Sequence, residues 1–337
     1  MKMDEKTVKI IKIIEKKSIN QWINELMKDY EVIAPVKESD EEVFFRIIKS
    51  SDDACMDFSN TVLSPKEFFF PQSEKIFEFD GEEILDIGMD IDKDKNDQKR
   101  ILFGVRPCDV HSLTILDNVY MGEFNDPYYS GRRENTIIIS AACSDPDEHC
   151  FCKSTGTGPY LCDADIILTD LGDRYFVESK TNDLVNSDIF KEPASDDIKL
   201  KDIKQRESED KINKTIDLNK NLDDLNLDKI VKGCLACACC TYICPTCTCF
   251  DVIDESMISA RKGKRFRCWD SCMFSSFTLL AGGENPREKK VERFKQRLYH
   301  KFKYYPKKYG KPGCVGCGRC IKRCPVNMDI VEIINKS

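Results

Sequence analysis

Two cysteine runs with identical spacing are the residues in this sequence best suited to chemistry. Each run reads C-x2-C-x2-C-x3-C-P. The runs consist of Cys234, Cys237, Cys240 and Cys244, and of Cys314, Cys317, Cys320 and Cys324. In the bacterial ferredoxin pattern, three thiolates on a tight loop bind three irons of a [4Fe–4S] cube, and the fourth cysteine binds the other cube. The spacing therefore predicts two [4Fe–4S] clusters, one on Cys234, Cys237, Cys240 and Cys324 and the other on Cys314, Cys317, Cys320 and Cys244.

A pair of zinc sites is the alternative interpretation of these runs, because zinc sites of four cysteines also use C-x2-C spacing. Zinc needs two cysteine pairs for each site. It has no use for a third cysteine at this spacing and a fourth before proline, and here both occur twice. The pattern favours iron–sulfur clusters. The competing hypothesis, from a different functional class, is a zinc-bearing binding module.

Further thiols lie beside the first run. Cys239 is interpreted as a small buried filler. Cys247 and Cys249 join Cys268 and Cys272 as four thiols that form a possible extra metal site. The alternative is that some of them only give the two predicted clusters sulfur-rich surroundings.

A separate group of cysteines occurs in the first half of the chain. Cys108 follows a strand-like segment at the start of a predicted helix, and Cys143 follows the next strand, with Cys150 and Cys152 in the loop beyond. Loops at the carboxyl ends of strands are the usual place for sites in α/β sheets. Four thiols suffice for a third [4Fe–4S] cluster, but the C-x6-C-x-C spacing alone leaves ordinary buried thiols as an equal alternative. Cys162 is a fifth candidate ligand for this cluster or a spare thiol. Cys55 is interpreted as an ordinary core or surface thiol.

Composition limits the class of protein. The chain has 337 residues, 41% hydrophobic and 33% charged, with a formal net charge of −7, which indicates a globular protein and argues against a nucleic-acid binder. The sequence contains no run of about 18 apolar residues, so no membrane-spanning helix is predicted. The 19 cysteines are an odd number, and the first residues do not resemble a signal peptide. Disulfides therefore explain the cysteines poorly, and we expect a cytoplasmic protein.

The sequence offers no motif for bond chemistry of its own. It contains no G-x-G-x-x-G after a strand, no phosphate-binding G-x4-G-K-[ST] and no H-E-x-x-H. We therefore expect no flavin or NAD(P) site within this chain and no catalytic residues. The three histidines, His111, His149 and His300, are interpreted as surface residues.

Alternating strand and helix patterns predict an α+β N-terminal domain, residues 1–185. A helix is expected over about residues 7–28, followed by strands in the segments YEVIAPV, EVFFRII, EKIFEF, RILFGV, TIIIS, DIILTDL and RYFVES. The polar residues 186–225 predict a linker with a lead-in helix. Residues 226–337 are expected to form a mainly α-helical ferredoxin-like domain that holds both C-terminal clusters.

A basic segment separates the two cysteine runs. Residues 286–313 contain eleven Lys or Arg against two Glu, interleaved with aromatic residues. Such a mixture is compatible with RNA binding. The favoured interpretation is a basic wrap around negatively charged clusters, or a docking surface for an acidic redox partner.

The order of these motifs resembles a known family. The segments that carry the resemblance are FGVRPCDVHSLTILDNVYMGEF, CSDPDEHCFC, CLACACCTYICPTCTCFDV, RFRCWDSCMF and CVGCGRCIKRCP. They are similar to the iron–sulfur beta subunit of cytoplasmic sulfhydrogenases and to the corresponding iron–sulfur component of anaerobic sulfite reductase. The segment TVLSPKEFFFPQSEKIFEFD favours the sulfhydrogenase branch, and the match runs from about residue 30 to 330.

The resemblance implies an electron-relay protein that works between two partners. One partner would be a reductase that binds flavin and NAD(P). The other would be catalytic, either a nickel–iron hydrogenase or a siroheme sulfite reductase. Most cysteines of this chain match cysteine positions of the family. They are both C-terminal runs, the four N-terminal residues Cys108, Cys143, Cys150 and Cys152, and also Cys247, Cys249 and Cys272. The N-terminal match favours the third cluster, whereas Cys239 and Cys268 depart from the family.

Overall fold

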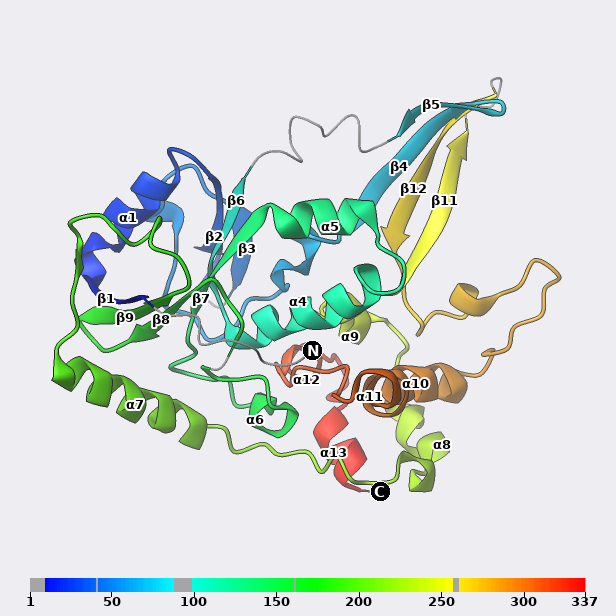
Figure 1. Cartoon of the computed structure of the whole chain (residues 1–337). Helices are drawn as coiled ribbons and strands as arrows, with labels where there is room; N and C mark the ends of the chain where they lie inside the picture. The colour runs from blue at the N-terminus through cyan, green and yellow to red at the C-terminus, as the bar shows by residue number, and fades with distance from the viewer. Residues whose placement is uncertain (1–9, 41, 88–98, 161, 257–260, 337) are drawn as a thin grey trace.

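The computed structural model describes residues 10–40, 42–87, 99–160, 162–256 and 261–336. Its main body is an eight-stranded sheet in the order β10-β1-β9-β8-β7-β6-β2-β3 (Figure 1). The strands are β1 (Ile10–Glu15), β2 (Glu31–Lys37), β3 (Val43–Ile47), β6 (Arg100–Val105), β7 (Thr136–Ala141), β8 (Ile166–Asp170), β9 (Arg174–Ser179) and β10 (Phe190–Lys191). The central strands β2, β6, β7 and β8 run parallel, and the outer pairs are antiparallel.

Both faces of this sheet are covered, so its central strands are apolar on both sides. On β6, Ile101 and Phe103 belong to a core with α1 (Ile19–Leu26), and Leu102 belongs to a second core with α4 (Pro107–Tyr120) and α5 (Pro127–Glu134). Leu200 of α7 (Ser195–Asp210) packs against a third, smaller core. The expected mixture of α and β structure is thus present, with parallel central strands between two layers of helices.

One element at the start of the chain differs from the expectation. The helix predicted over about residues 7–28 is helical only in α1, while β1 occupies its first half; residues 7–9 lie outside the described part of the chain. β1 pairs with β9 over its whole length and also with β10. Ile13 and Ile14 are buried in separate cores. Pairing and burial on both faces thus override a helical pattern that exists only in the local sequence.

A second, four-stranded antiparallel sheet has the order β11-β12-β4-β5. It combines β4 (Ser73–Asp80) and β5 (Glu83–Ile87) with the distant hairpin β11 (Phe250–Ser256) and β12 (Lys262–Trp269). In Figure 1 it projects from the main body at the upper right. The hairpin means that a mainly α-helical C-terminal part is not confirmed. The boundaries 1–185, 186–225 and 226–337 stay a prediction, and this sheet joins strands from the first and the last of these segments.

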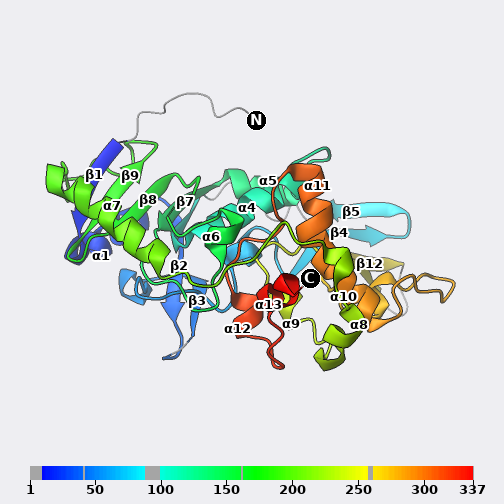
Figure 2. The same ribbon diagram turned by 90° about the horizontal axis from the view of Figure 1, so that it is seen from below.

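Short helices surround the two C-terminal cysteine runs. They are α6 (Cys152–Thr155), α8 (Leu227–Ile230), α9 (Cys239–Tyr242), α10 (Lys290–Tyr299), α11 (Tyr305–Tyr309), α12 (Arg319–Lys322) and α13 (Ile330–Asn335), with a π-helical turn at His300–Tyr304 between α10 and α11. Seen from below, α9, α12 and α13 gather in one place (Figure 2). No helix in the described ranges is both long enough and apolar enough to cross a membrane.

Candidate metal centre

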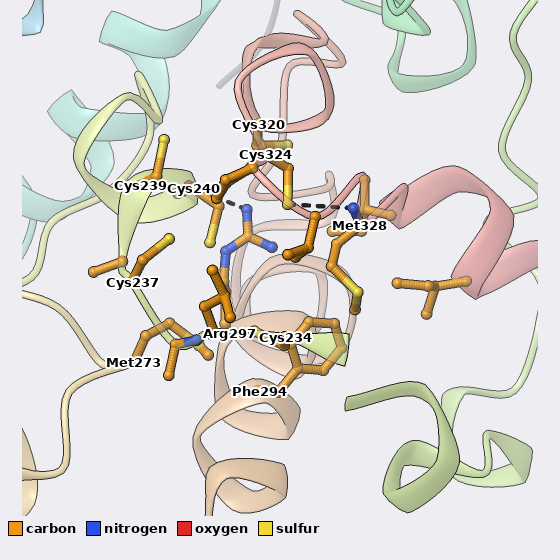
Figure 3. A pocket seen from close by; sticks show the side chains of 17 residues that line it. Cys234, Cys237, Cys239, Cys240, Met273, Phe294, Arg297, Cys320, Cys324 and Met328 are labelled. Carbon is orange, nitrogen blue, oxygen red and sulfur yellow. Dashed lines mark hydrogen bonds between the residues drawn. The ribbon is translucent and has the colours of Figure 1, made fainter. Parts of the chain in front are cut away.

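The two C-terminal cysteine runs line two neighbouring cavities. Cys234, Cys237, Cys240 and Cys324 all line the first cavity. In Figure 3 the thiols of Cys237, Cys240 and Cys324 point toward its centre, whereas that of Cys239 points away. The Cys239 thiol instead lies 3.3 Å from the carbonyl oxygen of Arg323. The four thiols predicted to hold one cluster thus lie around one space, and Cys239 lies outside it.

The second cavity is lined by the other predicted ligand set, Cys244, Cys314, Cys317 and Cys320. Cys320 and Arg297 line both cavities, so the two cysteine sets are direct neighbours. Each set exchanges one cysteine with the other run, because Cys324 lies with the first run and Cys244 with the second. This is the arrangement that the ferredoxin-type spacing predicts.

Backbone N–H groups point at the thiols in both cysteine loops. The N–H of Ala236 lies 3.4 Å from the Cys234 sulfur, and the N–H of Gly316 lies 3.5 Å from the Cys314 sulfur. The N–H of Met328 lies 3.2 Å from the Cys324 sulfur, the dashed line at Met328 in Figure 3. Backbone donors of this kind commonly surround the sulfurs of metal-bound cysteines.

Two buried cations lie among these thiols. Arg297 is 6% exposed and Lys301 is 7% exposed. The Arg297 guanidinium donates to the Cys240 carbonyl, and the Lys301 ammonium donates to the Thr246 hydroxyl at 2.7 Å and the Gly313 carbonyl at 3.1 Å. Arg297 Nε has no hydrogen-bond partner among the described residues.

The strongest charge interactions of these two cations are with cysteines. Burial favours the neutral amine of Lys301, but the charge of Cys244, Cys314 and Cys247 outweighs it and raises the Lys301 pKa. The Arg297 pKa is raised in the same way: burial opposes the charged form, and the cysteines, Cys240 first, outweigh it. A buried cation is costly without a negative counter-charge. A group carrying negative charge on these thiolates supplies it, so the residues present fit a pair of thiolate-bound clusters.

The four N-terminal cysteines are brought to the same region. Cys108 lies in the first turn of α4, Cys143 follows β7, and Cys152 begins α6. Because β6 and β7 are parallel neighbours, their carboxyl ends place Cys108 and Cys143 at one edge of the sheet. Cys152 is close enough to Cys108 and Cys143 for their charges to interact, and Cys150 is similarly close to Cys143 and Cys152. Burial raises the pKa of the Cys152 thiol to about 12.

This N-terminal group lies directly against the second C-terminal loop. Cys317 is close enough to interact electrostatically with Cys108, Cys150 and Cys152. The Cys150 sulfur lies 3.7 Å from the Cys317 carbonyl oxygen, and the Phe151 N–H donates to the Gly316 carbonyl at 2.8 Å. The Cys314–Cys320 loop therefore adjoins both of the other cysteine sets.

Gly316 makes the close contact between these loops possible. Its φ is +62°, and a Cβ added there would lie 2.6 Å from the backbone of Phe151 and Cys152. Ala236 has a similar φ of +55° in the equivalent position of the first loop, so φ alone does not require glycine. The close approach of the Cys152 loop does.

We expect Gly316→Ala to destabilise the protein by about 1–3 kcal/mol, because the methyl group overlaps backbone that has no free space to move into. Thermal unfolding under anaerobic conditions measures the change. Gly310→Ala is the matched control: its φ is +73°, but nothing lies within 4 Å of the added Cβ. Equal losses in the two variants would contradict the close-contact argument.

A buried ion pair joins the Cys314–Cys320 loop to α4, which carries Cys108. Arg319, between Cys317 and Cys320, places its guanidinium 2.6 and 2.7 Å from the two carboxylate oxygens of Asp109. Asp109 follows Cys108 in α4 and is fully buried. The remaining Arg319 donors reach the Thr61 carbonyl and hydroxyl at 2.9 and 2.8 Å. Bidentate geometry of this kind fixes orientation as well as distance.

Other cysteines lie outside the three sets. The Cys55 thiol lies 3.3 Å from the Asp57 carbonyl, and the Cys268 thiol lies 3.5 Å from the Ser73 hydroxyl. Cys162 packs against the core that contains Leu102. Across the described ranges, no three Cys, His, Asp or Glu side chains are arranged as ligands of one metal ion.

A basic wrap around the clusters was expected from the sequence. Of the buried cations in the basic segment, Arg297 and Lys301 line the cysteine cavities, whereas Arg293 donates to the Met273 carbonyl. Three cations at four-residue steps, Arg293, Arg297 and Lys301, are buried on one side of the helical segment, while Lys295 is exposed. That spacing was the available signal, since residues four apart share a helix face. The Asp109–Arg319 pair had no such signal, because its partners are 210 residues apart.

Comparison with known proteins identifies the family. A family model described as a 4Fe-4S dicluster domain matches residues 233–328, which contain both C-terminal cysteine runs. The chain is 33% identical over 333 residues to the protein named sulfhydrogenase 2 subunit beta from Pyrococcus furiosus, covering 94% of this chain and 95% of that one. No solved structure matches this chain. The resemblance inferred from the cysteine motifs is thus confirmed, and the chain belongs to the family of sulfhydrogenase beta subunits.

Proposed function

We propose that this chain relays single electrons within a cytoplasmic sulfhydrogenase-like complex, between a reductase partner that binds flavin and NAD(P) and a catalytic nickel–iron partner. The observation that carries the proposal is the adjacency of three cysteine sets. Cys244 with the Cys314–Cys320 loop adjoins both the N-terminal four and the set made of Cys324 with the Cys234–Cys240 loop. The name of the Pyrococcus relative supports the hydrogenase over the sulfite reductase assignment.

Bound [4Fe–4S] clusters supply one-electron oxidation and reduction. The residues of this chain do the rest by holding and surrounding them. Backbone N–H groups donate to the ligand sulfurs, and Arg297 and Lys301 place positive charge beside thiolates. Both effects favour the more negative, reduced state of a site. The buried apolar residues around the loops, such as Phe151 and Phe294, exclude water.

The metal content of protein purified without oxygen is the first test. We expect at least about 12 iron and 12 sulfide per chain from these three sets, counted as four of each per cluster. Cys150→Ser should lose about four of each relative to the unchanged protein. Cys55→Ser, outside all three sets, should lose none. No loss on Cys150→Ser would reduce the N-terminal cysteines to ordinary thiols.

The relay itself is tested on the same samples by absorbance. The isolated chain should be bleached by dithionite but not by NADH or NADPH, because the nucleotide site belongs to a partner. The assembled complex should be bleached by the nucleotide. Stoichiometric zinc without iron would overturn the proposal in favour of a binding module, and reduction of the isolated chain by NADH would assign it a nucleotide site of its own.

A further inference from the structure

The Cys234–Cys240 loop and the Cys314–Cys320 loop are repeats of one structural unit. They read CLACACC and CVGCGRC, so each residue of one loop has an equivalent in the other. Their backbones agree as well, since Ala236 and Ala238 have positive φ, as do their equivalents Gly316 and Gly318. A difference in the surroundings of two such loops therefore comes from the rest of the chain and not from the loops.

The Cys314–Cys320 loop is covered by a segment of the chain that carries cysteines of its own. The Thr157 hydroxyl donates to the Val315 carbonyl at 2.7 Å, beside the contact made by Phe151 that is described above. Val315 is 1% exposed. The covering segment belongs to the N-terminal cysteine set, so one group of candidate cluster ligands lies directly against the loop of another.

The corresponding face of the Cys234–Cys240 loop is open. Leu235, the equivalent of Val315, is 64% exposed. Cys237 is exposed, whereas its equivalent Cys317 is buried. An exposed leucine alone would indicate nothing. Here the buried equivalent shows that this position can carry the contact between a cluster loop and a segment that bears further candidate ligands.

A proline beside the same cavity shows the same contrast. Pro325 is exposed, whereas its equivalent Pro245 is buried. Leu235, Cys237 and Pro325 all line the first cavity, and we call these three residues the open face. Of the cysteines in the described ranges, Cys237 alone is exposed, so the first set presents a candidate ligand directly to solvent.

Positive charge lies beside the open face. The Lys290 ammonium lies 2.6 Å from the Cys234 carbonyl oxygen. Lys232, just before the loop, is exposed and has no ion-pair partner among the described residues. The segment that covers the other loop is acidic, and its Asp147 forms a 2.6 Å ion pair with Lys322 of α12. Opposite charges thus join a loop of this type to its covering segment, and the open face offers the positive half of such a contact.

We propose that the open face docks an acidic loop of a partner protein, and that this loop carries a one-electron centre. The partner's loop rests on Leu235 and Cys237 in the way that the N-terminal cysteine segment rests on Val315 and Cys317. A single electron passes between that centre and the cluster held by the first set; one is oxidised as the other is reduced, and no bond forms or breaks. The inference rests on the proposed function for that cluster, and it adds the place and the charge of the contact.

Acetylation of lysines, followed by mass spectrometry, tests the place of the contact. It compares the isolated chain with the complex that this chain forms, purified without oxygen through a tag on the chain. We expect Lys232 to react several-fold more slowly in the complex, because a docked loop excludes reagent and water from it. Equal reaction of Lys232 in the two samples would overturn the inference.

Leu235→Asp tests the open face directly in the same complex. It places a negative charge against the acidic loop, so we expect electron transfer through this chain to slow by about tenfold or more. The rate of NADP reduction by hydrogen measures this transfer. Iron content and bleaching by dithionite should stay unchanged, because Leu235 is not a ligand. Leu279→Asp is the matched control: Leu279 is 56% exposed and does not line the cavity, so this variant should behave like the unchanged protein.

Lys232→Glu tests the charge of the contact, and it remains informative if Leu235→Asp disturbs the loop, because Lys232 does not line the cavity. Added salt should slow transfer in the unchanged complex, and Lys232→Glu should be slower at low salt and less sensitive to salt. Transfer equal to that of the unchanged protein at every salt concentration would overturn the inference while leaving the relay intact. A dimer of the isolated chain that Leu235→Asp dissociates would assign the open face to a second copy, and would overturn it as well. A chain without iron would instead overturn the proposed function.

Discussion

Replacing Arg297 with glutamine is expected to lower the reduction potentials of both C-terminal clusters by roughly 40–90 mV. The guanidinium is buried, lines both cavities and has cysteines as its strongest charge interactions. One buried charge near a redox site contributes about 1–2 kcal/mol at an effective dielectric constant of about 20. That energy corresponds to the stated shift for one electron. Loss of the positive charge makes an added electron less favourable, so the potentials fall.

A redox titration monitored by electron paramagnetic resonance measures these potentials. Lys295→Gln is the matched control, because it removes the same charge from the same helix at an exposed position, where water screens the charge. Arg297→Lys should show little of this fall in potential, since the charge remains. Equal potentials in Arg297→Gln and the unchanged protein would show that the buried guanidinium serves packing alone.

Asp109→Asn should destabilise the protein by about 3–5 kcal/mol. The substitution leaves the Arg319 guanidinium, which is 3% exposed, buried without its carboxylate. Because this pair ties the Cys108 segment to the Cys317 loop, the N-terminal cluster should also be lost more readily. Anaerobic thermal unfolding and the iron content of the recovered protein measure the two effects.

Two comparisons give this prediction its meaning. Lys322→Ala removes a nearby ion pair to Asp147 in which the lysine is half exposed, and it should cost no more than about 1 kcal/mol. The double variant Asp109→Leu with Arg319→Met removes both charges and should be more stable than Asp109→Asn alone, because no lone charge stays buried. If Asp109→Asn unfolds like the unchanged protein, the pair does not hold the loops together.

Much of the main sheet could be predicted because its strands are marked locally. The segments RILFGV, TIIIS and RYFVES are short apolar or β-branched runs, and they form β6, β7 and β9. The first strand could not be predicted in this way. Its isoleucines also fit a helix, and only pairing with β9 and β10 decides between the two.

The sequence by itself determined the dicluster, since C-x2-C-x2-C spacing places three ligands on one loop whatever surrounds it. Tertiary structure decided the rest. It brought Cys108 and Cys152 against Cys317, paired β4 with β12, and buried Arg297 and Lys301 among thiols. These contacts join segments far apart in the chain, so no local pattern encodes them. Their energies depend on burial, and burial exists only once the chain has folded.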